Sequence, residues 1–318
     1  MNWNETEIFI SGGSGSLGQA LTQLLLEKYN PKGIRIFSRG EFLQWEMKNK
    51  FNRLYPNAPI SYLIGDVQDR KRVELASKGV NLIIHCAALK HVPVGEDNPL
   101  EAIKTNIIGA QNILYAALEN KVEKVIAIST DKAVAPINLY GATKMCAEKL
   151  FIQGGTYSGG RNPRFSCVRY GNVVGSRGSI VPLFKKQYSE TGKITITDEH
   201  MTRFWITLSQ VSHFILQAIE DMKGEEIFIP KMASATVLEI AKGICPDAKI
   251  EIVGIRPGEK LHETLITKEE SLHTEIKGNR FEIANSTANL KPFEYRSDNN
   301  PHWLTQEQIK EMVETHII

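Results

Sequence analysis

The stretch ISGGSGSLG, residues 10–18, follows a short apolar run and opens a segment with helical apolar spacing. Gly13, Gly15 and Gly18 fit the GxGxxG spacing, and Gly12, Gly15 and Gly18 fit GxxGxxG. Residues without a Cβ permit a tight turn and let the backbone approach a pyrophosphate, while the following helix supplies N–H donors and positive dipole. Together, the apolar run, the glycines and the helix predict a dinucleotide-binding unit.

Outward from this turn, short apolar runs alternate with helical patterns. Because this alternation is typical of βαβ units, it predicts an α/β fold: a Rossmann-type doubly wound parallel sheet. Apolar residues run on continuously within the strands, which fits a sheet buried on both faces. Strands are expected at 7–11, 34–38, 60–64, 81–87 and 124–129, and helices at 16–29, 41–51, 69–79 and 98–120.

The alternation of apolar runs and helical patterns becomes less regular after residue 172. We therefore expect a cofactor-binding Rossmann domain over 1–172 and a smaller C-terminal substrate-binding lobe over 173–318. Late strands such as 226–230 are expected to interleave the lobe with the Rossmann sheet. Since the chain has no repeat, low-complexity tract or long linker, the two parts are expected to pack as one unit.

Composition indicates an ordinary globular protein. The 318 residues are 42% hydrophobic and 23% charged, with a net charge of +2, so nothing favours nucleic acid as a partner. The four scattered cysteines are expected to be free thiols in a reducing compartment. No segment approaches the ~20 apolar residues of a membrane span, and no signal peptide is visible, so we expect a cytoplasmic protein.

The end of the second expected strand bears on cofactor choice. An acidic residue there would hold the ribose hydroxyls of NAD, but this chain has Ser38 and Arg39. A hydroxyl and a guanidinium suit a 2′-phosphate, which favours NADP. Asp66, after the third strand, is expected near the adenine, and residues 85–91 are expected beside the nicotinamide.

The stretch AISTDKAVAPINLYGATK, residues 127–144, gathers four titratable side chains. Tyr140 and Lys144 lie one helical turn apart, and from the sequence we expect Lys144 to lower the pKa of the phenol so that it acts as a base. Asp131 and Lys132 follow the fifth strand, at the sheet edge where ligands of such folds bind. A hydride-transfer site with an extra acid–base pair is therefore predicted.

These motifs resemble the extended short-chain dehydrogenase/reductase family, in its nucleotide-sugar-modifying branch. The resemblance is greatest to the inverting UDP-N-acetylglucosamine 4,6-dehydratases of pseudaminic acid synthesis, in the polysaccharide-biosynthesis dehydratase family. It covers nearly the whole chain and rests on GGSGSLG, SRGE, GDV, ALKHVP, KTNIIGA, STDKA, NLYGATK, VRYGNVVGSRGSIVP, MTRFWI and GIRPGEKLHE.

The resemblance implies a closed redox cycle on a UDP-sugar. Tyr140 would take the 4-hydroxyl proton while NADP, tightly bound and regenerated in each turnover, takes and later returns the hydride. Thr130 would hydrogen-bond the C4 oxygen, and Asp131 would occupy the position of a general acid. Lys132 replaces the glutamate base of the retaining dehydratases and can remove the C5 proton only if its pKa falls towards neutrality.

The resemblance also implies two sets of binding residues. Arginines suit diphosphate oxygens, and a carboxylate suits ribose hydroxyls. The substrate set is Lys90, Lys132, Asn172, Val173, Arg177, Thr195, Arg203, Arg256, Glu259 and Asn300, with Asn299 as an alternative to the last. The cofactor set is Gly12, Ser14, Gly15, Ser16, Leu17, Gly18, Ser38, Arg39, Asp66, Val67, Cys86, Ala87, Ala88, Lys90, Asn106, Ser129, Tyr140 and Lys144.

Several alternatives stay open at this point. Gly40, Gly95 and Asp97 depart from the family pattern, which leaves room for a relative that only forms or uses a 5,6-ene sugar. A UDP-sugar 4-epimerase would share Tyr140 and Lys144 without needing the extra pair. An NADP-sensing regulator is the alternative outside enzymes. The resemblance implies a homo-oligomer, and no metal site is expected because the histidines show no ligand spacing.

Overall fold

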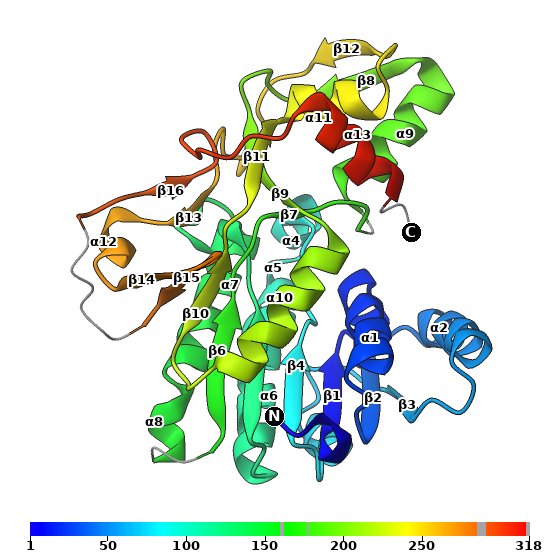
Figure 1. Ribbon diagram of the computed structural model, residues 1–318, viewed down its shortest axis with the longest axis vertical. Coiled ribbons are helices and arrows are strands. Elements are labelled where there is room, and N and C mark those ends of the chain that lie inside the picture. Colours follow the sequence, from blue (N-terminus) through cyan, green and yellow to red (C-terminus); the bar gives the residue numbers. More distant parts are fainter. Residues whose placement is uncertain (160–161, 177, 285–290, 316–318) are drawn as a thin grey trace.

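The structure is a computed structural model that describes residues 1–159, 162–176, 178–284 and 291–315. Within that part of the chain, the central sheet has nine strands in the order β14-β15-β10-β6-β5-β4-β1-β2-β3 (Figure 1). Its strands are β1 (Glu7–Ser11), β2 (Gly33–Ser38), β3 (Ile60–Ile64), β4 (Leu82–His85), β5 (Lys124–Ile128), β6 (Arg164–Val168), β10 (Ile227–Pro230), β14 (Thr274–Lys277) and β15 (Arg280–Ile283).

From β3 across to β10, neighbouring strands pair in parallel, whereas β15 is antiparallel to both β10 and β14. Strand order reverses around β1, which has β2 on one side and β4 on the other. This is the predicted doubly wound parallel sheet, and that prediction is confirmed.

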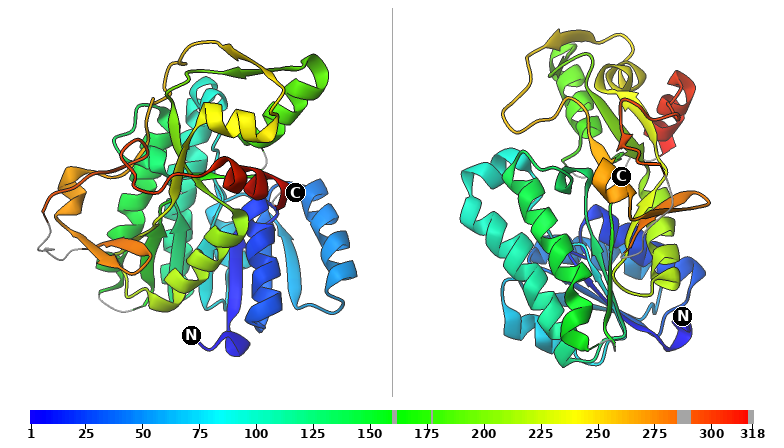
Figure 2. Two further views of the ribbon diagram at one scale, coloured as in Figure 1. Left: turned by 45° about the horizontal axis from the view of Figure 1, so that its top comes forward. Right: turned by 90° about the vertical axis from the view of Figure 1, so that its left-hand side faces the viewer.

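Helices cover both faces of the sheet (Figure 2). One face carries α3 (Arg70–Ala76), α6 (Gly109–Glu119), α7 (Leu139–Ile152) and α8 (Gly154–Ser158). On the other face α1 (Ser16–Lys28) packs against α10 (Leu208–Asp221), while α2 (Glu41–Leu54) follows β2 near the sheet edge. Every residue of β4 and β10 is buried, which explains why these strands are apolar throughout rather than alternating.

The segment after Asn98 differs from the single helix expected over 98–120. It divides into α5 (Pro99–Ile103), a π-helical turn η2 (Lys104–Ile108) and α6. The buried Asn106 side chain accepts from Leu89 N at 2.8 Å and donates to Leu89 O at 3.0 Å. These bonds to a neighbouring loop favour the local departure from α geometry, a pattern that recurs at functional sites.

The C-terminal lobe stands above the carboxyl ends of the parallel strands (Figure 1). Smaller sheets join β7 (Asn172–Val173) with β9 (Thr202–Ile206) and β11 (Ala233–Thr236), β8 (Lys193–Ile196) with β12 (Lys249–Ile252), and β13 (Thr264–Ile266) with β16 (Tyr295–Arg296). The remaining helices are α4 (Val92–Asp97), α9 (Ile180–Thr191), α11 (Val237–Ile244), α12 (Lys268–Ser271) and α13 (Gln306–Thr315).

The chain enters the lobe, returns to the central sheet through β10, and enters and leaves again before β14 and β15. Two small apolar clusters form the lobe's own core, one around Trp205 and Ile309 and one around Phe184 and Ile194. The division after residue 172 stays a prediction. No described helix combines the length and apolar character needed to cross a membrane.

Candidate active site

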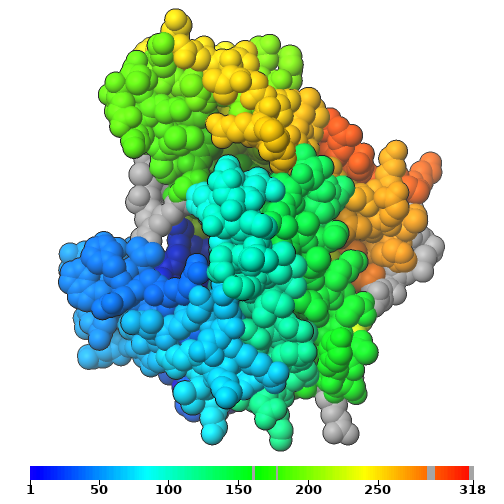
Figure 3. All heavy atoms as spheres, turned by 180° about the vertical axis from the view of Figure 1, so that it is seen from behind, coloured from blue at the N-terminus to red at the C-terminus, as the bar shows by residue number. Residues whose placement is uncertain are grey.

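A cleft of about 750 Å³ lies between the carboxyl ends of the parallel strands and the C-terminal lobe. Its floor includes the turns after β1, β2, β4 and β5, on both sides of the point where strand order reverses. Such a switch point is where open α/β sheets bind their ligands. From behind, the surface is hollowed where the blue and cyan N-terminal segments meet the green lobe (Figure 3).

The glycine turn lines one end of this cleft, where its glycines expose the backbone. Gly12 has φ +68°, and a Cβ there would lie 2.8 Å from Ala87 N. A Cβ on Gly18 would lie 2.4 Å from Gly13 O, so a side chain is excluded where α1 meets the turn. Since α1 begins at Ser16 with Gly15 as an N-cap that has no side-chain hydrogen bond, its first amides suit an anion.

The end of β2 lies beside this turn and carries no carboxylate. Ser38 Oγ is 2.8 Å from Ser14 Oγ and accepts from Gln44 Nε2 at 2.9 Å. The Arg39 side chain is 58% exposed, with one guanidinium nitrogen 3.5 Å from Asp66 Oδ2. The cleft edge therefore presents a hydroxyl and a cation, as the sequence predicts.

The other expected cofactor residues fall into two layers. Those on the cleft wall are Ser14, Ser16, Leu17, Val67, Cys86, Ala87, Ala88, Lys90 and Ser129. Asn106 does not line the cleft but is buried behind it, where it holds the Leu89 backbone and donates to Thr143 Oγ1 at 2.9 Å. Asn106 therefore shapes the wall rather than facing a ligand.

Tyr140 and Lys144 line the cleft from the first two turns of α7. The helix begins there because the N-cap Asn138 accepts from Gly141 N at 2.8 Å, while Glu96 accepts from Leu139 N at 2.7 Å. The Asn138 amide also donates to Gly258 O at 2.8 Å. Helix α7 is thereby tied to the loop that precedes β13.

The pKa of the Tyr140 phenol corrects one expectation. Burial raises this pKa to about 12, although the Lys132 ammonium and a hydrogen bond with Thr130 act to lower it. From the sequence we expect Lys144 to be the lowering cation, but in the structure burial also lowers the pKa of Lys144. Lys132 is therefore the cation that chiefly favours the phenolate, and burial outweighs it.

The turn after β5 arranges Thr130, Asp131 and Lys132 at two depths. Asp131 is fully buried, and its Oδ1 accepts from Thr130 Oγ1 and from Lys132 Nζ, both at 2.9 Å. Thr130 and Lys132 line the cleft, and the Lys132 side chain is 25% exposed. Asp131 is therefore placed to act through its neighbours from beneath the cleft surface.

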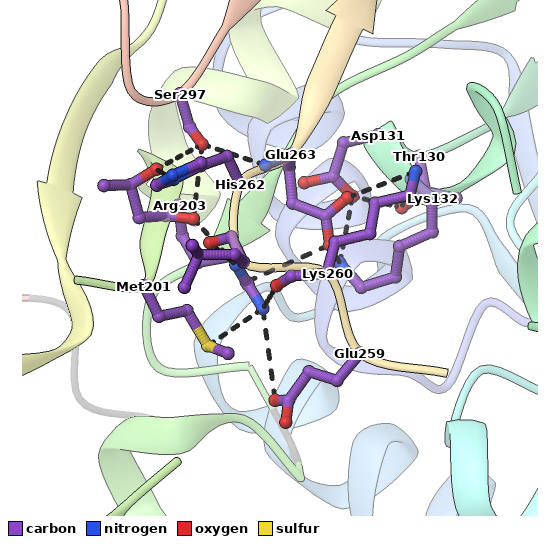
Figure 4. Close-up of polar contacts among 12 residues, drawn as sticks. Thr130, Asp131, Lys132, Met201, Arg203, Glu259, Lys260, His262, Glu263 and Ser297 are labelled. Atoms are coloured by element: carbon purple, nitrogen blue, oxygen red, sulfur yellow. Dashed lines mark hydrogen bonds and ion pairs between the residues drawn. The ribbon is translucent and has the colours of Figure 1, made fainter. Parts of the chain in front are cut away.

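A second carboxylate faces Lys132 from the other side (Figure 4). Glu263, 2% exposed, lies between η3 (Asp131–Ala133) and the lobe, with Oε1 3.7 Å from Lys132 Nζ. The motif GIRPGEKLHE contains it, but sequence reasoning selected only Arg256 and Glu259 from that motif. The signal that sequence could have offered is an acidic residue three positions after Lys260, within a motif already assigned to the substrate.

Comparison with known proteins establishes the family. The polysaccharide biosynthesis protein family matches residues 8–285. The chain belongs to this family. This polysaccharide biosynthesis protein is also 45% identical to the UDP-N-acetylglucosamine 4,6-dehydratase (inverting) of Campylobacter jejuni subsp. jejuni serotype O:2, with 98% of each chain covered. The resemblance read from the sequence motifs is therefore confirmed.

Other relatives carry different names. The polysaccharide biosynthesis protein is 36% identical to a UDP-glucose 4-epimerase of Rickettsia canadensis, covering 97% of this chain and 95% of that one. Among solved structures, Pen from Bacillus thuringiensis superimposes with a TM-score of 0.92 at 37% identity, with 98% of each chain covered. DesIV, a dTDP-glucose 4,6-dehydratase from Streptomyces venezuelae, has a TM-score of 0.71 at 20% identity, covering 80% and 86%, which shows the shared fold alone.

In this polysaccharide biosynthesis protein the charge of Lys132 is set by opposing effects. Burial acts to lower its pKa, but the carboxylates of Asp131 and Glu263 outweigh burial, and the net pKa is raised. A C5 base at this position would need a lowered pKa. Because the net pKa of Lys132 is raised instead, its resting side chain is an ammonium. A base role for Lys132 therefore needs a route by which its proton leaves.

Only part of the expected substrate set reaches the cleft. Lys90, Lys132, Asn172 and Val173 line it. Arg203 is buried, and its guanidinium donates to the carbonyls of residues 202, 260 and 261. Asn300 is buried, with its amide donating to Met232 O and Ser234 Oγ. Those two are corrected from ligand contacts to residues that hold the lobe together, because their donors are already used.

The remaining expected contacts lie away from the cleft wall. Thr195 Oγ1 accepts from Gln187 Nε2 at 2.8 Å within the lobe. Arg256 is exposed, and Glu259 faces Arg203 at 4.0 Å. Asn299 caps the turn at Arg296, whose N–H donates to its Oδ1 at 3.1 Å. Arg177 lies outside the described residues.

The cleft also includes residues that the sequence reasoning missed. Tyr170 and Gly171 line it directly after β6, and Trp205 and Leu208 line it from the lobe. The motif VRYGN, following a strand, could have indicated the first two. Among the described residues, no group of three His, Cys, Asp or Glu side chains is arranged to hold a metal ion.

Proposed function

We propose that this protein catalyses the 4,6-dehydration of UDP-N-acetylglucosamine with inversion at C5. The product would be UDP-2-acetamido-2,6-dideoxy-β-L-arabino-hex-4-ulose, for pseudaminic acid-type glycans. The observation that carries the proposal is that Lys132, paired with Asp131, lines the same cleft as Tyr140 and Lys144. The full-length relative named as an inverting dehydratase supports it.

The residues at the glycine turn fit a nicotinamide dinucleotide. The exposed backbone of Gly12 and Gly15 on the cleft wall, beside the start of α1, suits a pyrophosphate. Ser38 and Arg39 would bind a 2′-phosphate, so we propose NADP, held tightly through the cycle. When bound, the cofactor supplies hydride acceptance from C4 and hydride return to C6.

Tyr140 would take the proton of the sugar 4-hydroxyl. Its buried phenol is a strong base once ionised, and the Lys132 ammonium and the Thr130 hydroxyl favour the ionised form. Thr130 lines the cleft and would donate to the C4 oxygen once its hydroxyl turns away from Asp131 Oδ1, to which it donates in the structure. Lys144, one turn along α7, adds an amine beside Tyr140 in the same cleft.

Lys132 would remove the C5 proton and supply the proton with which the 6-hydroxyl leaves. A ketone at C4 acidifies the C5 proton, so that a neutral amine close to C5 is strong enough to remove it. Asp131, hydrogen-bonded to both Thr130 and Lys132, orients the pair and keeps the group's overall charge low. The departing 6-hydroxyl leaves as water with a proton from this group.

Two further enzyme activities stay as alternatives. A UDP-sugar 4-epimerase is favoured by the Rickettsia relative and needs only Tyr140 and Lys144. An enzyme that performs part of the cycle would form or use a 5,6-ene sugar. We also propose a cytoplasmic homo-oligomer, which the exposed apolar side chains of Leu100, Ile103 and Met145 support.

The test is incubation of the purified protein with UDP-N-acetylglucosamine in deuterated water, followed by mass and NMR analysis of the sugar. We expect a 4-keto product that has lost water, carries deuterium at C5 and has inverted configuration there. Recovery of a 4-epimer with an intact 6-hydroxyl would instead identify an epimerase. Accumulation of a 5,6-ene would identify an enzyme of the partial cycle.

A further inference from the structure

Glu263 is a buried carboxylate that closes the charge network around Lys132. Its Oε1 lies 3.7 Å from Lys132 Nζ and 3.9 Å from Arg203 Nε, and its Oε2 lies 3.7 Å from Lys260 Nζ. Asp131 completes the group from η3. Figure 4 shows Glu263 between the Asp131–Lys132 turn and the Arg203 guanidinium, pointing toward both.

The backbone holds Glu263 firmly in this position. Its N–H donates to Ser297 Oγ at 2.9 Å, and Ser297 N–H donates to Glu263 O at 2.9 Å. Nearby, Lys260 Nζ donates to Val134 O at 2.6 Å, which pins the loop to the turn after β5. The carboxylate is thus fixed relative to Lys132 by contacts on both sides.

The carboxylate keeps capacity for a proton. Glu263 Oε2 is buried and accepts no hydrogen bond among the described residues, which is costly for a charged oxygen and less so for a protonated one. Burial raises the pKa of Glu263, with Asp131 adding to the rise, while Lys132, Arg203 and Lys260 act to lower it. Burial acts on both groups in the sense that favours a neutral pair of Lys132 amine and Glu263 acid, against the carboxylates that raise the net pKa of Lys132.

We propose that Glu263 is the positioning residue that takes the Lys132 proton and so frees the amine for its work at C5. This inference rests on the dehydration proposed above. A Lys132 Nζ–H bond breaks as a Glu263 Oε1–H bond forms, after a closing movement of less than 1 Å from the 3.7 Å separation. The C5–H bond then breaks as a new Nζ–H bond forms, and its electron pair enters the enolate of the C4 ketone.

The same protons complete the elimination. The enolate expels the 6-hydroxyl, which leaves as water with the proton that Lys132 has just gained. The Glu263 proton then returns to the Lys132 amine and restores the ion pair. No proton is gained from or lost to solvent in these steps, so the C5 chemistry is insulated from the pH around the protein.

Geometry favours Glu263 over Asp131 as the acceptor. Each carboxylate has one buried oxygen without a hydrogen-bond partner among the described residues, Asp131 Oδ2 and Glu263 Oε2. The other oxygen of Asp131 accepts from Thr130 and from Lys132, which stabilises the Asp131 charge in place. The Glu263 carboxylate lies 3.7 Å from Lys132 and Lys260 and 3.9 Å from Arg203. These distances are longer than a hydrogen bond. The less stabilised carboxylate is the better proton acceptor.

The test uses the holoenzyme and the UDP-4-keto sugar that still carries its 6-hydroxyl and its original C5 configuration. NMR follows loss of the C5 proton in the elimination, a reaction that does not need the Tyr140 step. The variants are Glu263→Gln, Glu263→Asp and Asp131→Asn. The control for loss of a buried carboxylate is Glu226→Gln, at the amino end of β10, opposite the cleft. Thermal unfolding establishes that each variant is folded.

We expect the wild-type rate of C5 proton loss to be nearly independent of pH between about pH 6 and about pH 8, since the proton stays within the pair. In Glu263→Gln, Lys132 must lose its proton to solvent. The rate of C5 proton loss should fall at least about tenfold at neutral pH and rise about tenfold per pH unit. Glu263→Asp should keep the flat profile at a reduced rate, and Glu226→Gln should match the wild type.

Other outcomes overturn the proposal. Wild-type rate and a flat profile in Glu263→Gln would show that this carboxylate takes no proton. A steep profile in Asp131→Asn alone would assign the role to Asp131. A wild-type enzyme that turns UDP-N-acetylglucosamine into a 4-epimer would refute the dehydration itself. Dehydration by the wild type together with unchanged Glu263→Gln would refute only the role of Glu263.

Discussion

At Lys132, two physical effects of opposite sign meet on one amine. Burial disfavours the ammonium, whereas carboxylates at 2.9 Å and 3.7 Å favour it and prevail. A glutamate at this position would face two other carboxylates, and the resulting repulsion would change the chemistry of the whole network. A lysine here therefore goes with an acidic partner on the lobe, and Glu263 supplies that partner.

At Arg39, the exposed guanidinium permits a test of cofactor choice. We predict that Arg39→Asp weakens NADP binding by at least roughly tenfold, because a charge-assisted hydrogen bond to phosphate is worth about 1.5–3 kcal/mol. NAD binding should strengthen relative to NADP, since a carboxylate suits ribose hydroxyls. Fluorescence titration with both cofactors measures the ratio.

The control for that experiment is Arg53→Asp, the same charge reversal at an exposed position near the far end of α2. It should leave both affinities unchanged. Equal NADP affinity in wild type and Arg39→Asp would contradict a 2′-phosphate site at the end of β2.

At the scale of elements, α7 is fixed at its start by one side chain with two tasks. Asn138 caps the helix through its carbonyl oxygen and holds Gly258 O through its amide. We predict that Asn138→Ala lowers the free energy of unfolding by about 1 kcal/mol. Asn138→Asp should keep the cap and nearly the full stability, but lower kcat/KM by roughly tenfold, because the loop after β12 loses its tie.

Denaturant unfolding and steady-state kinetics on both variants separate the two tasks. If Asn138→Asp retains wild-type kcat/KM, the Gly258 contact does not position the site. If it loses as much stability as Asn138→Ala, the amide rather than the carbonyl stabilises the helix start.

Sequence and structure agree best where local pattern alone decides an element. The strands at 7–11 and 60–64 form at the predicted residues. The helix expected over 98–120 breaks because Asn106 bonds to Leu89, a tertiary contact that helical periodicity does not encode.

The site shows the same division. The glycine turn, Tyr140 and Lys144 were predictable because their spacing within one segment carries the chemistry. Glu263 was not, because only the fold brings it beside Lys132 from 131 residues further along the chain. Arg203 and Asn300 were predicted to contact the substrate because they lie in binding motifs. A polar side chain in such a motif contacts a ligand when it faces the cleft and bonds to the backbone when it is buried, and these two are buried.

At the scale of the whole molecule, the buried His85 makes stability depend on pH. It lies under the cleft, 2.7 Å from Ser11 Oγ, and burial lowers its pKa to about 3, with Lys144 adding to the effect. The unfolded chain binds this proton near pH 6.5, so between these values it holds more protons than the native state. Stability therefore falls as the pH drops through that window, by up to about 1.4 kcal/mol per unit.

We predict that His85→Asn, which keeps a polar partner for Ser11, removes this dependence. Between pH 7 and pH 5 the wild type should lose about 2 kcal/mol more unfolding free energy than the variant. Urea unfolding at both pH values measures this difference. The exposed His213→Asn is the control and should follow the wild type. Parallel curves for wild type and His85→Asn would contradict the assignment.

The contacts between the loop over residues 258–263 and the turn after β5 also bear on how this family diversifies. Asn138 holds Gly258, Lys260 holds Val134, and Glu263 faces Lys132. A chimera that grafts only one of these segments from an epimerase relative would pair a loop with a foreign counterpart. Residues 130–138 and 258–263 therefore form one transplantable cassette, and a change of reaction in the laboratory or in evolution has to move them together.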